Sequence, residues 1–117
     1  MVKDTETVIQ EFTELVNMDP DELEEWLGTE ASLSTGWPKS DGSGESIGHE
    51  SGRKIVQILR HNPEKDPEAF EEHEIQHMRK VVSYCKRHLA REENSKRNPE
   101  SRSYRSLKNW GHDALKE

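Results

Sequence analysis

The chain has 117 residues, of which 35% are charged and only 29% are hydrophobic. Leu, Ile, Val and Phe number 21 in total, which leaves room for one domain, 1–117, with a small core. No apolar run approaches the roughly 18 residues of a membrane span, and the N-terminus lacks the apolar stretch of a signal peptide. The single Cys85 cannot form an internal disulfide. We therefore expect an intracellular protein of the cytoplasm, nucleus or nucleoid, without membrane contact.

The charges are divided unevenly along the chain. Residues 1–50 contain thirteen acidic residues and two basic ones, whereas residues 51–117 contain eleven acidic and fifteen basic residues. Between Gln76 and Trp110 there are ten basic residues and three acidic ones. The formal net charge of -7 therefore conceals a basic segment, which predicts a cationic surface on an acidic protein.

The first two predicted helices are acidic and amphipathic. Residues 4–18 place apolar side chains on one side of a helix and carboxylates on the other. Asp19 and Pro20 form a strong helix start, because a capping carboxylate is followed by a proline where the helical N–H is free anyway. This start predicts a second helix over 20–27, with a left-handed stop at Gly28.

A long loop and a third helix follow. Residues 29–45 are rich in Gly, Ser and Pro without periodicity, so they predict a loop, with Trp37 as its anchor. The third helix begins near Ser46 and ends before Pro63. Its predicted inner face consists of Ile47, Ser51, Ile55, Ile58 and Leu59.

Two glycines, Gly48 and Gly52, lie one turn apart on the adjoining face of this third helix. Each costs a helix about 1 kcal/mol relative to alanine, so their presence indicates that something approaches the backbone closely. A neighbouring helix or the loop that carries Trp37 would explain them. The alternatives are a ligand phosphate at the helix N-terminus, or a partner protein in a docking groove formed by Trp37, Gly48 and Gly52.

The best helix of the chain is predicted over residues 68–92. Its apolar residues recur at steps of three and four and form one continuous seam. A polar linker, 92–100, separates it from a short last helix, which Ser101 or Ser103 caps and Gly111 ends. The seam consists of Ile75, Met78, Val82, Cys85 and Leu89.

Together these elements predict an all-α fold, a small bundle of four main helices plus a short C-terminal helix. The helix over 68–92 is expected to be central, packed by the first and third helices. Trp26 and Trp110 are expected to be at least partly buried against it. No stretch has the alternation of a strand.

His73 and His77 match the spacing that puts two zinc-binding imidazoles on one helical face, with Glu74 between them. A zinc site needs a third protein ligand, and no zincin continuation follows. The pair is therefore only a weak metal candidate, and structural or solvated histidines explain it as well. We predict no resident metal, no cofactor and no catalytic residue.

The basic segment gives the broader functional signal, because its cations recur along three predicted helices. They predict either a phosphate-facing surface or cations that pair with the acidic first half of the chain. The candidate nucleic-acid-binding residues are Arg53, Lys54, Arg79, Lys80, Lys86, Arg87, Arg91, Arg105 and Lys108.

Four blocks of the sequence resemble an uncharacterised family of small bacterial and fungal proteins, domain of unknown function 3140. The resemblance implies a small helical, non-secreted protein, and it brings no established activity, although some members carry a DNA-binding label. The blocks are VNMDPDELEEWLGTEAS (16–32), GESIGHESGRKIVQIL (44–59), HMRKVVSYCKRHLA (77–90) and YRSLKNWGHDAL (104–115).

Taken together, the sequence predicts a non-enzymatic binding module that contacts the backbone of DNA or RNA through a basic helical face. The first alternative is a protein-interaction or regulatory domain. The remote alternative is metal binding through His73 and His77. The oligomeric state stays open.

Overall fold

The computed structural model describes residues 4–35, 45–91 and 98–116, and Trp37 lies outside these ranges. Within them the chain is all-α, as predicted, and contains no strand. The elements are α1 (Thr5–Leu15), α2 (Pro20–Leu27), α3 (Glu30–Leu33), α4 (Ile47–His61), α5 (Glu72–Arg91), α6 (Arg102–Asn109) and the 3-10 helix η1 (Ala114–Lys116).

Side-chain caps fix where most of these helices begin. Asp19 accepts a hydrogen bond from the backbone N–H of Glu22, and the Glu22 carboxylate accepts one from the backbone N–H of Asp19. This capping box satisfies two N–H groups that a helix start leaves without partners. At the starts of α4 and α6, the hydroxyls of Ser46 and Ser101 accept hydrogen bonds from the backbone N–H groups of His49 and Tyr104. These signals are local in sequence, which is why α2 was predicted at its observed bounds.

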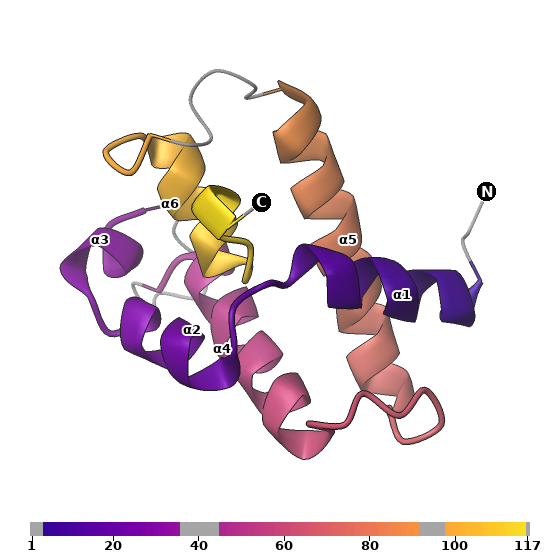
Figure 1. The fold of residues 1–117 in the computed structure, drawn as a ribbon. Coiled ribbons are helices and arrows are strands. Elements are labelled where there is room, and N and C mark those ends of the chain that lie inside the picture. The colour runs from indigo at the N-terminus through magenta and orange to yellow at the C-terminus, as the bar shows by residue number, and fades with distance from the viewer. Residues whose placement is uncertain (1–3, 36–44, 92–97, 117) are drawn as a thin grey trace.

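The helices pack in two pairs that α6 connects (Figure 1). One pair consists of α1 lying across α5, and the other of α2 lying along α4. Helix α6 contacts α2, α3, α4 and α5. Helix α5 contacts α1, α4 and α6, in agreement with its predicted packing against the first and third main helices.

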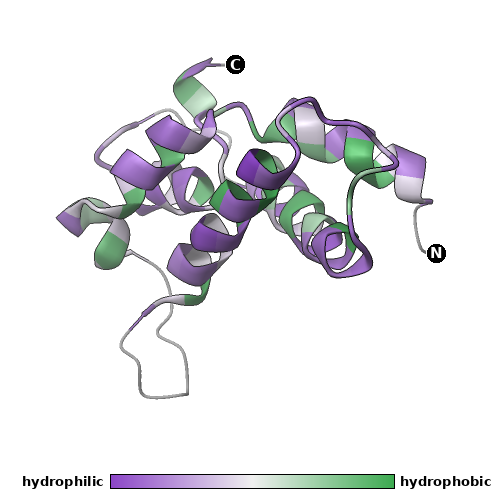
Figure 2. Ribbon diagram, turned by 90° about the horizontal axis from the view of Figure 1, so that it is seen from below, coloured by the Kyte–Doolittle hydropathy of each residue, from purple (hydrophilic) through white to green (hydrophobic). Residues whose placement is uncertain are grey.

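One core receives side chains from all of the longer helices. In the α5 seam, Met78, Val82 and Cys85 are buried, and Ile75 and Leu89 are partly buried. Figure 2 shows hydrophobic and hydrophilic residues side by side along the same helices, as expected for amphipathic elements. Burial raises the pKa of the Cys85 thiol to about 12, so it behaves as a small hydrophobic residue.

Trp110 packs on α5, where its ring lies parallel to that of Tyr84 at a centroid separation of 4.2 Å. Trp26 is half-buried, and its indole Nε1 donates to the Asn109 side chain on α6 at 2.8 Å. Both tryptophans therefore help to connect α6 to the rest of the fold.

Four local expectations are corrected. A short helix, α3, lies inside the predicted loop, because Thr29 caps it and four residues are too few to show periodicity. Gly28 ends α2 in a right-handed conformation, with φ -83°. Ile47, expected on the inner face of α4, is 52% exposed at the first helical position. Helix α5 begins at Glu72 instead of residue 68, since turns occupy the preceding segment.

Gly111 stops helix α6, as predicted, and this glycine has a left-handed backbone conformation with φ 82°. The backbone N–H of His112 donates to the carbonyl of Leu107, which closes the Schellman motif that ends α6. The chain then returns to the junction of α1 and α2. There the Asn17 amide donates to the carbonyl of Asp113 at 3.0 Å, and the Asp113 N–H donates back to Asn17 Oδ1 at 2.8 Å.

In the ranges that the structure describes, no helix combines the length and the apolar character that crossing a bilayer requires.

Candidate nucleic-acid interface

The cations of α5 form two rows on different sides of the helix. At 3.6 residues per turn, Arg79 and Lys86 share one direction, and Lys80, Arg87 and Arg91 share another, about 100° away. The distinction matters because α1 lies against only one side of α5.

The first row faces the acidic helix α1. The Lys86 ammonium forms an ion pair with the carboxylate of Glu11. Hydrogen bonds from Thr7 contribute most to lowering the pKa of the Asp4 carboxyl, and the positive charge of Arg79 adds a smaller contribution. The cations on this side of α5 are therefore neutralised by acidic residues of the same chain. The sequence analysis gave this pairing as the alternative to a phosphate-facing surface.

The second row, which we call the open row, consists of Lys80, Arg87 and Arg91. All three side chains are exposed, and within the described residues no carboxylate pairs with any of them. Arg87 donates to the hydroxyl of Ser83, at 3.2 Å. From the first residue to the last, the row extends about 16 Å along the helix, close to the axial rise of five nucleotides of B-DNA.

A groove between α4 and α5 adjoins the open row at Lys80. Its volume is about 310 Å³. Lys54 on α4 also lines it, and its ammonium lies 3.8 Å from a carboxylate oxygen of Glu50, a long distance for an ion pair. We call it the α4–α5 groove. Its lining residues are Lys54, Gln57, Ile58, His73, Glu74, Gln76, His77 and Lys80.

His77 is held in this groove by its neighbours. Its Nε2 lies 2.9 Å from the hydroxyl of Ser51, and its ring lies parallel to that of Trp110, with centroids 6.3 Å apart. Burial, and then the ammonium groups of Lys54 and Lys80, lower the pKa of His77 to about 4. The imidazole is therefore neutral at pH 7.

This lowered pKa predicts a loss of stability in acid. In the unfolded chain His77 has its ordinary pKa of 6.5, so between pH 6.5 and pH 4 the unfolded state binds a proton that the folded state does not. The free energy of unfolding then falls as the pH is lowered through this window, by at most about 3 kcal/mol. His77→Gln, which stays neutral, should remove most of this dependence in urea unfolding at about pH 7 and about pH 4.5.

The matched variant His73→Gln, at an exposed position one turn away, should retain the acid dependence. An NMR titration of the His77 ring protons should show a midpoint near pH 4. A midpoint near the ordinary 6.5 would contradict the assignment.

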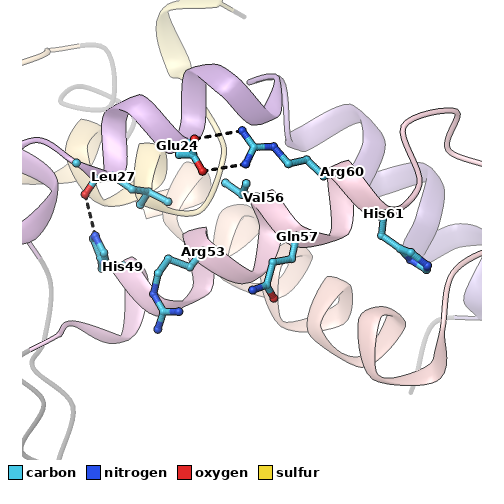
Figure 3. A pocket seen from close by; sticks show the side chains of 9 residues that line it. Glu24, Leu27, His49, Arg53, Val56, Gln57, Arg60 and His61 are labelled. Atoms are coloured by element: carbon cyan, nitrogen blue, oxygen red, sulfur yellow. Dashed lines mark hydrogen bonds and ion pairs between the residues drawn. The ribbon is translucent and has the colours of Figure 1, made fainter.

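A larger groove, of about 710 Å³, lies between α2 and α4, and Figure 3 shows Arg60 in its lining paired with Glu24. Arg60 donates to both carboxylate oxygens of Glu24, at 2.8 and 3.2 Å, and to Asp21. Arg53 donates to both oxygens of Glu45 at 2.7 Å, and this hydrogen bonding contributes most to lowering the pKa of Glu45 to about 2. This groove therefore presents paired charges to solvent.

His49 closes one end of the larger groove. Its Nε2 lies 2.8 Å from the carbonyl oxygen of Leu27, which can only accept, so this nitrogen carries a proton. Its Nδ1 lies 2.5 Å from Glu45. The imidazole thereby connects the end of α2 to the beginning of α4.

The remaining predicted cations, Arg105 and Lys108, lie on α6, and each contacts a partner of its own. Arg105 lies 3.5 Å from the carboxylate of Glu100. The ammonium of Lys108 lies over the ring of Trp26, 4.5 Å from its centroid, and 5.6 Å from that of Tyr104. Such contacts between a cation and an aromatic face are attractive, and they direct Lys108 toward α2.

The face of α4 that carries Gly48 and Gly52 is filled from within the chain. A Cβ atom on Gly48 would lie 3.1 Å from Nε1 of Trp110, and one on Gly52 would lie 2.6 Å from the carbonyl oxygen of Asn109. These contacts match the neighbouring-helix explanation of the two glycines, because Asn109 at the end of α6 lies against both of them. The third predicted member of the docking groove, Trp37, lies outside the described residues.

His73 and His77 do not converge on a metal ligand set. His73 is exposed, with Nδ1 3.4 Å from a carboxylate oxygen of Glu71, whereas His77 is turned to Ser51 and Trp110. Glu74, between them in sequence, is buried and faces His61 at 3.0 Å. Among the residues described, no three His, Cys, Asp or Glu side chains lie together as metal ligands.

The sequence analysis missed Gln57 and Gln76, which line the α4–α5 groove. Gln76 lies between His73 and His77, in the segment whose predicted metal role rested on His73, Glu74 and His77. Their shared groove depends on the packing of α4 against α5, for which the sequence has no local signal.

The described residues define a small all-α protein with one open cationic row beside a polar groove. The chain belongs to the family described as "Protein of unknown function (DUF3140)", which it matches over residues 11–108. This confirms the family resemblance of the four sequence blocks. No curated protein and no solved structure matches the chain.

Proposed function

We propose that this protein is a non-enzymatic binding module that contacts the phosphate backbone of nucleic acid through the open row of α5. The observation that carries the proposal is the separation of the α5 cations. Arg79 and Lys86 face the acids of α1, while Lys80, Arg87 and Arg91 point together to solvent without a carboxylate partner among the described residues.

A row of cations along one helix suits a phosphate backbone better than it suits a small anion. Arginine and lysine on one face can each contact a successive phosphate and release its condensed counterions. Phosphate contacts of this kind carry no sequence information, so binding is expected to be independent of sequence. The acidic surface elsewhere limits the contact to this one side of the molecule.

Salt-titrated binding tests the proposal. With three phosphate contacts, affinity for labelled duplex DNA should fall about 40-fold between about 50 and 200 mM salt, a logarithmic slope near -2.7. Arg87→Gln should reduce the magnitude of the slope by about 0.9, because one phosphate contact is lost. Fluorescence anisotropy with a labelled oligonucleotide measures both quantities.

Arg60→Gln is the matched control. It also replaces an exposed helical arginine, but one whose charge Glu24 and Asp21 already neutralise. The slope of this variant should equal that of the parent protein. Absence of binding at about 50 mM salt, or equal changes of slope in both variants, would overturn the proposal.

A further inference from the structure

We infer that the nucleic acid recognised by this protein is single-stranded, and that an unpaired base enters the α4–α5 groove while its backbone lies on the open row. This inference rests on the proposed function and names the kind of nucleic acid. It starts from the position of Lys80, which belongs both to the open row and to the lining of the groove.

The chemistry of the groove suits a base. Gln57 and Gln76 offer amide groups, of which the Gln76 nitrogen also donates weakly to Glu72 at 3.5 Å. Ile58 offers an apolar surface, Lys54 and Lys80 flank the groove with positive charge, and the Glu74 carboxylate in the lining faces His61. Amide side chains match the mixed donors and acceptors of base edges, whereas a phosphate offers acceptors only. At about 310 Å³ the recess is small, and its size fits one base better than a drug-sized ligand.

The ring of His77 adds a stacking surface at the same place. Four aromatic rings form a stacked series in the order His77, Trp110, Tyr84 and His88, with centroid separations of 6.3, 4.2 and 4.5 Å. His77 is at the end of this series that lines the groove. A base that stacks on His77 would extend the series by one ring, which is how single-stranded nucleic acid is commonly held on aromatic side chains.

A duplex cannot use this groove without disruption. In a duplex the bases are paired and stacked inside the two backbones, so insertion of a base beside Lys80 requires unpairing, at a cost of a few kcal/mol. A single strand exposes its bases beside the phosphates and avoids this cost. Single strands should therefore bind about tenfold or more tightly than a duplex of equal length at the same salt concentration.

The test compares a labelled single-stranded DNA of mixed sequence with its own duplex in fluorescence anisotropy at low salt. The variant is Gln57→Leu/Gln76→Leu, which removes both amides from the groove and leaves every charge in place. It should lose about tenfold in affinity for the single strand and keep its affinity for the duplex. The control is Gln10→Leu, an exposed glutamine on α1, which should change neither affinity.

The possible results separate the two proposals. A single-strand preference that the double variant abolishes supports the inference. Equal affinity of the parent protein for both forms, or an undiminished preference in the double variant, overturns the inference and leaves backbone binding by the open row in place. Absence of binding to either form at low salt overturns the proposed function and the inference with it.

Discussion

Gly52→Ala should lower the free energy of unfolding by about 2–3 kcal/mol, even though alanine favours a helix by about 1 kcal/mol over glycine. The added Cβ would lie 2.6 Å from the carbonyl oxygen of Asn109 and 2.6 Å from a methyl group of Leu27. The Leu27 side chain can rotate, but the Asn109 carbonyl belongs to the backbone at the end of α6. Helices α4 and α6 must therefore separate. Urea unfolding followed by circular dichroism measures the change.

Gly28→Ala is the matched control for this prediction. A Cβ on Gly28 would meet its nearest atom, the carbonyl oxygen of Glu25, at 3.5 Å, and Gly28 already has a right-handed φ of -83°. This variant should keep or slightly increase stability, because alanine restricts the unfolded chain. If Gly52→Ala were as stable as Gly28→Ala, the close approach of α6 to α4 would be contradicted.

Asn109→Leu should cost about 3 kcal/mol, because Asn109 supplies hydrogen bonds to two elements that meet at α6. It is 1% exposed, and its Oδ1 accepts from the indole of Trp26 at 2.8 Å and from the hydroxyl of Ser32 at 2.5 Å. Leucine has a similar size but accepts no hydrogen bond, so both donors lose their partner. The free energy of unfolding, again from urea titration, is the quantity to measure.

Ser32→Ala separates the contribution of one hydrogen bond from the other. It removes the donor on α3 but leaves Oδ1 of Asn109 bonded to Trp26, so it should cost only about 1 kcal/mol. In a double-mutant cycle, Asn109→Leu and Ser32→Ala should be clearly non-additive, since the two residues are in contact. Additive effects would show that Asn109 stabilises the fold without this hydrogen bond.

The parts of the fold that the sequence predicted well are those that local chemistry determines. The capping box at Asp19 and the proline at Pro20 lie next to one another in the chain, so they defined α2 directly. The seam of α5 likewise follows from spacing within a single helix. By contrast, Gly48 and Gly52 signalled a close contact, but only the structure identifies α6 as the neighbour.

The sequence predicted which types of residue form the candidate site, but not how the fold arranges them in space. Lys86 and Arg87 are adjacent in sequence and chemically alike, yet one pairs with Glu11 and the other faces solvent. The difference comes from the position of α1, a helix that is far from Lys86 and Arg87 in the sequence. Burial of the apolar side of α1 sets that position. For the same reason the sequence grouped Arg53 and Lys108 with the open row, although the fold directs them to Glu45 and Trp26.

The return of the chain to the junction of α1 and α2 has a consequence for biosynthesis. Asn17 and Asp113 are 96 positions apart, and the Leu15 carbonyl meets His112 across 97 positions. A ribosome adds about 5–20 residues per second, so α1 and α2 emerge several seconds before these partners exist. Helix α5, which covers α1, also appears late. The acidic helix α1 therefore lacks its main partner during most of translation, whereas α2 can pack on α4 earlier, and the carboxylates of α1 favour its solubility in that interval.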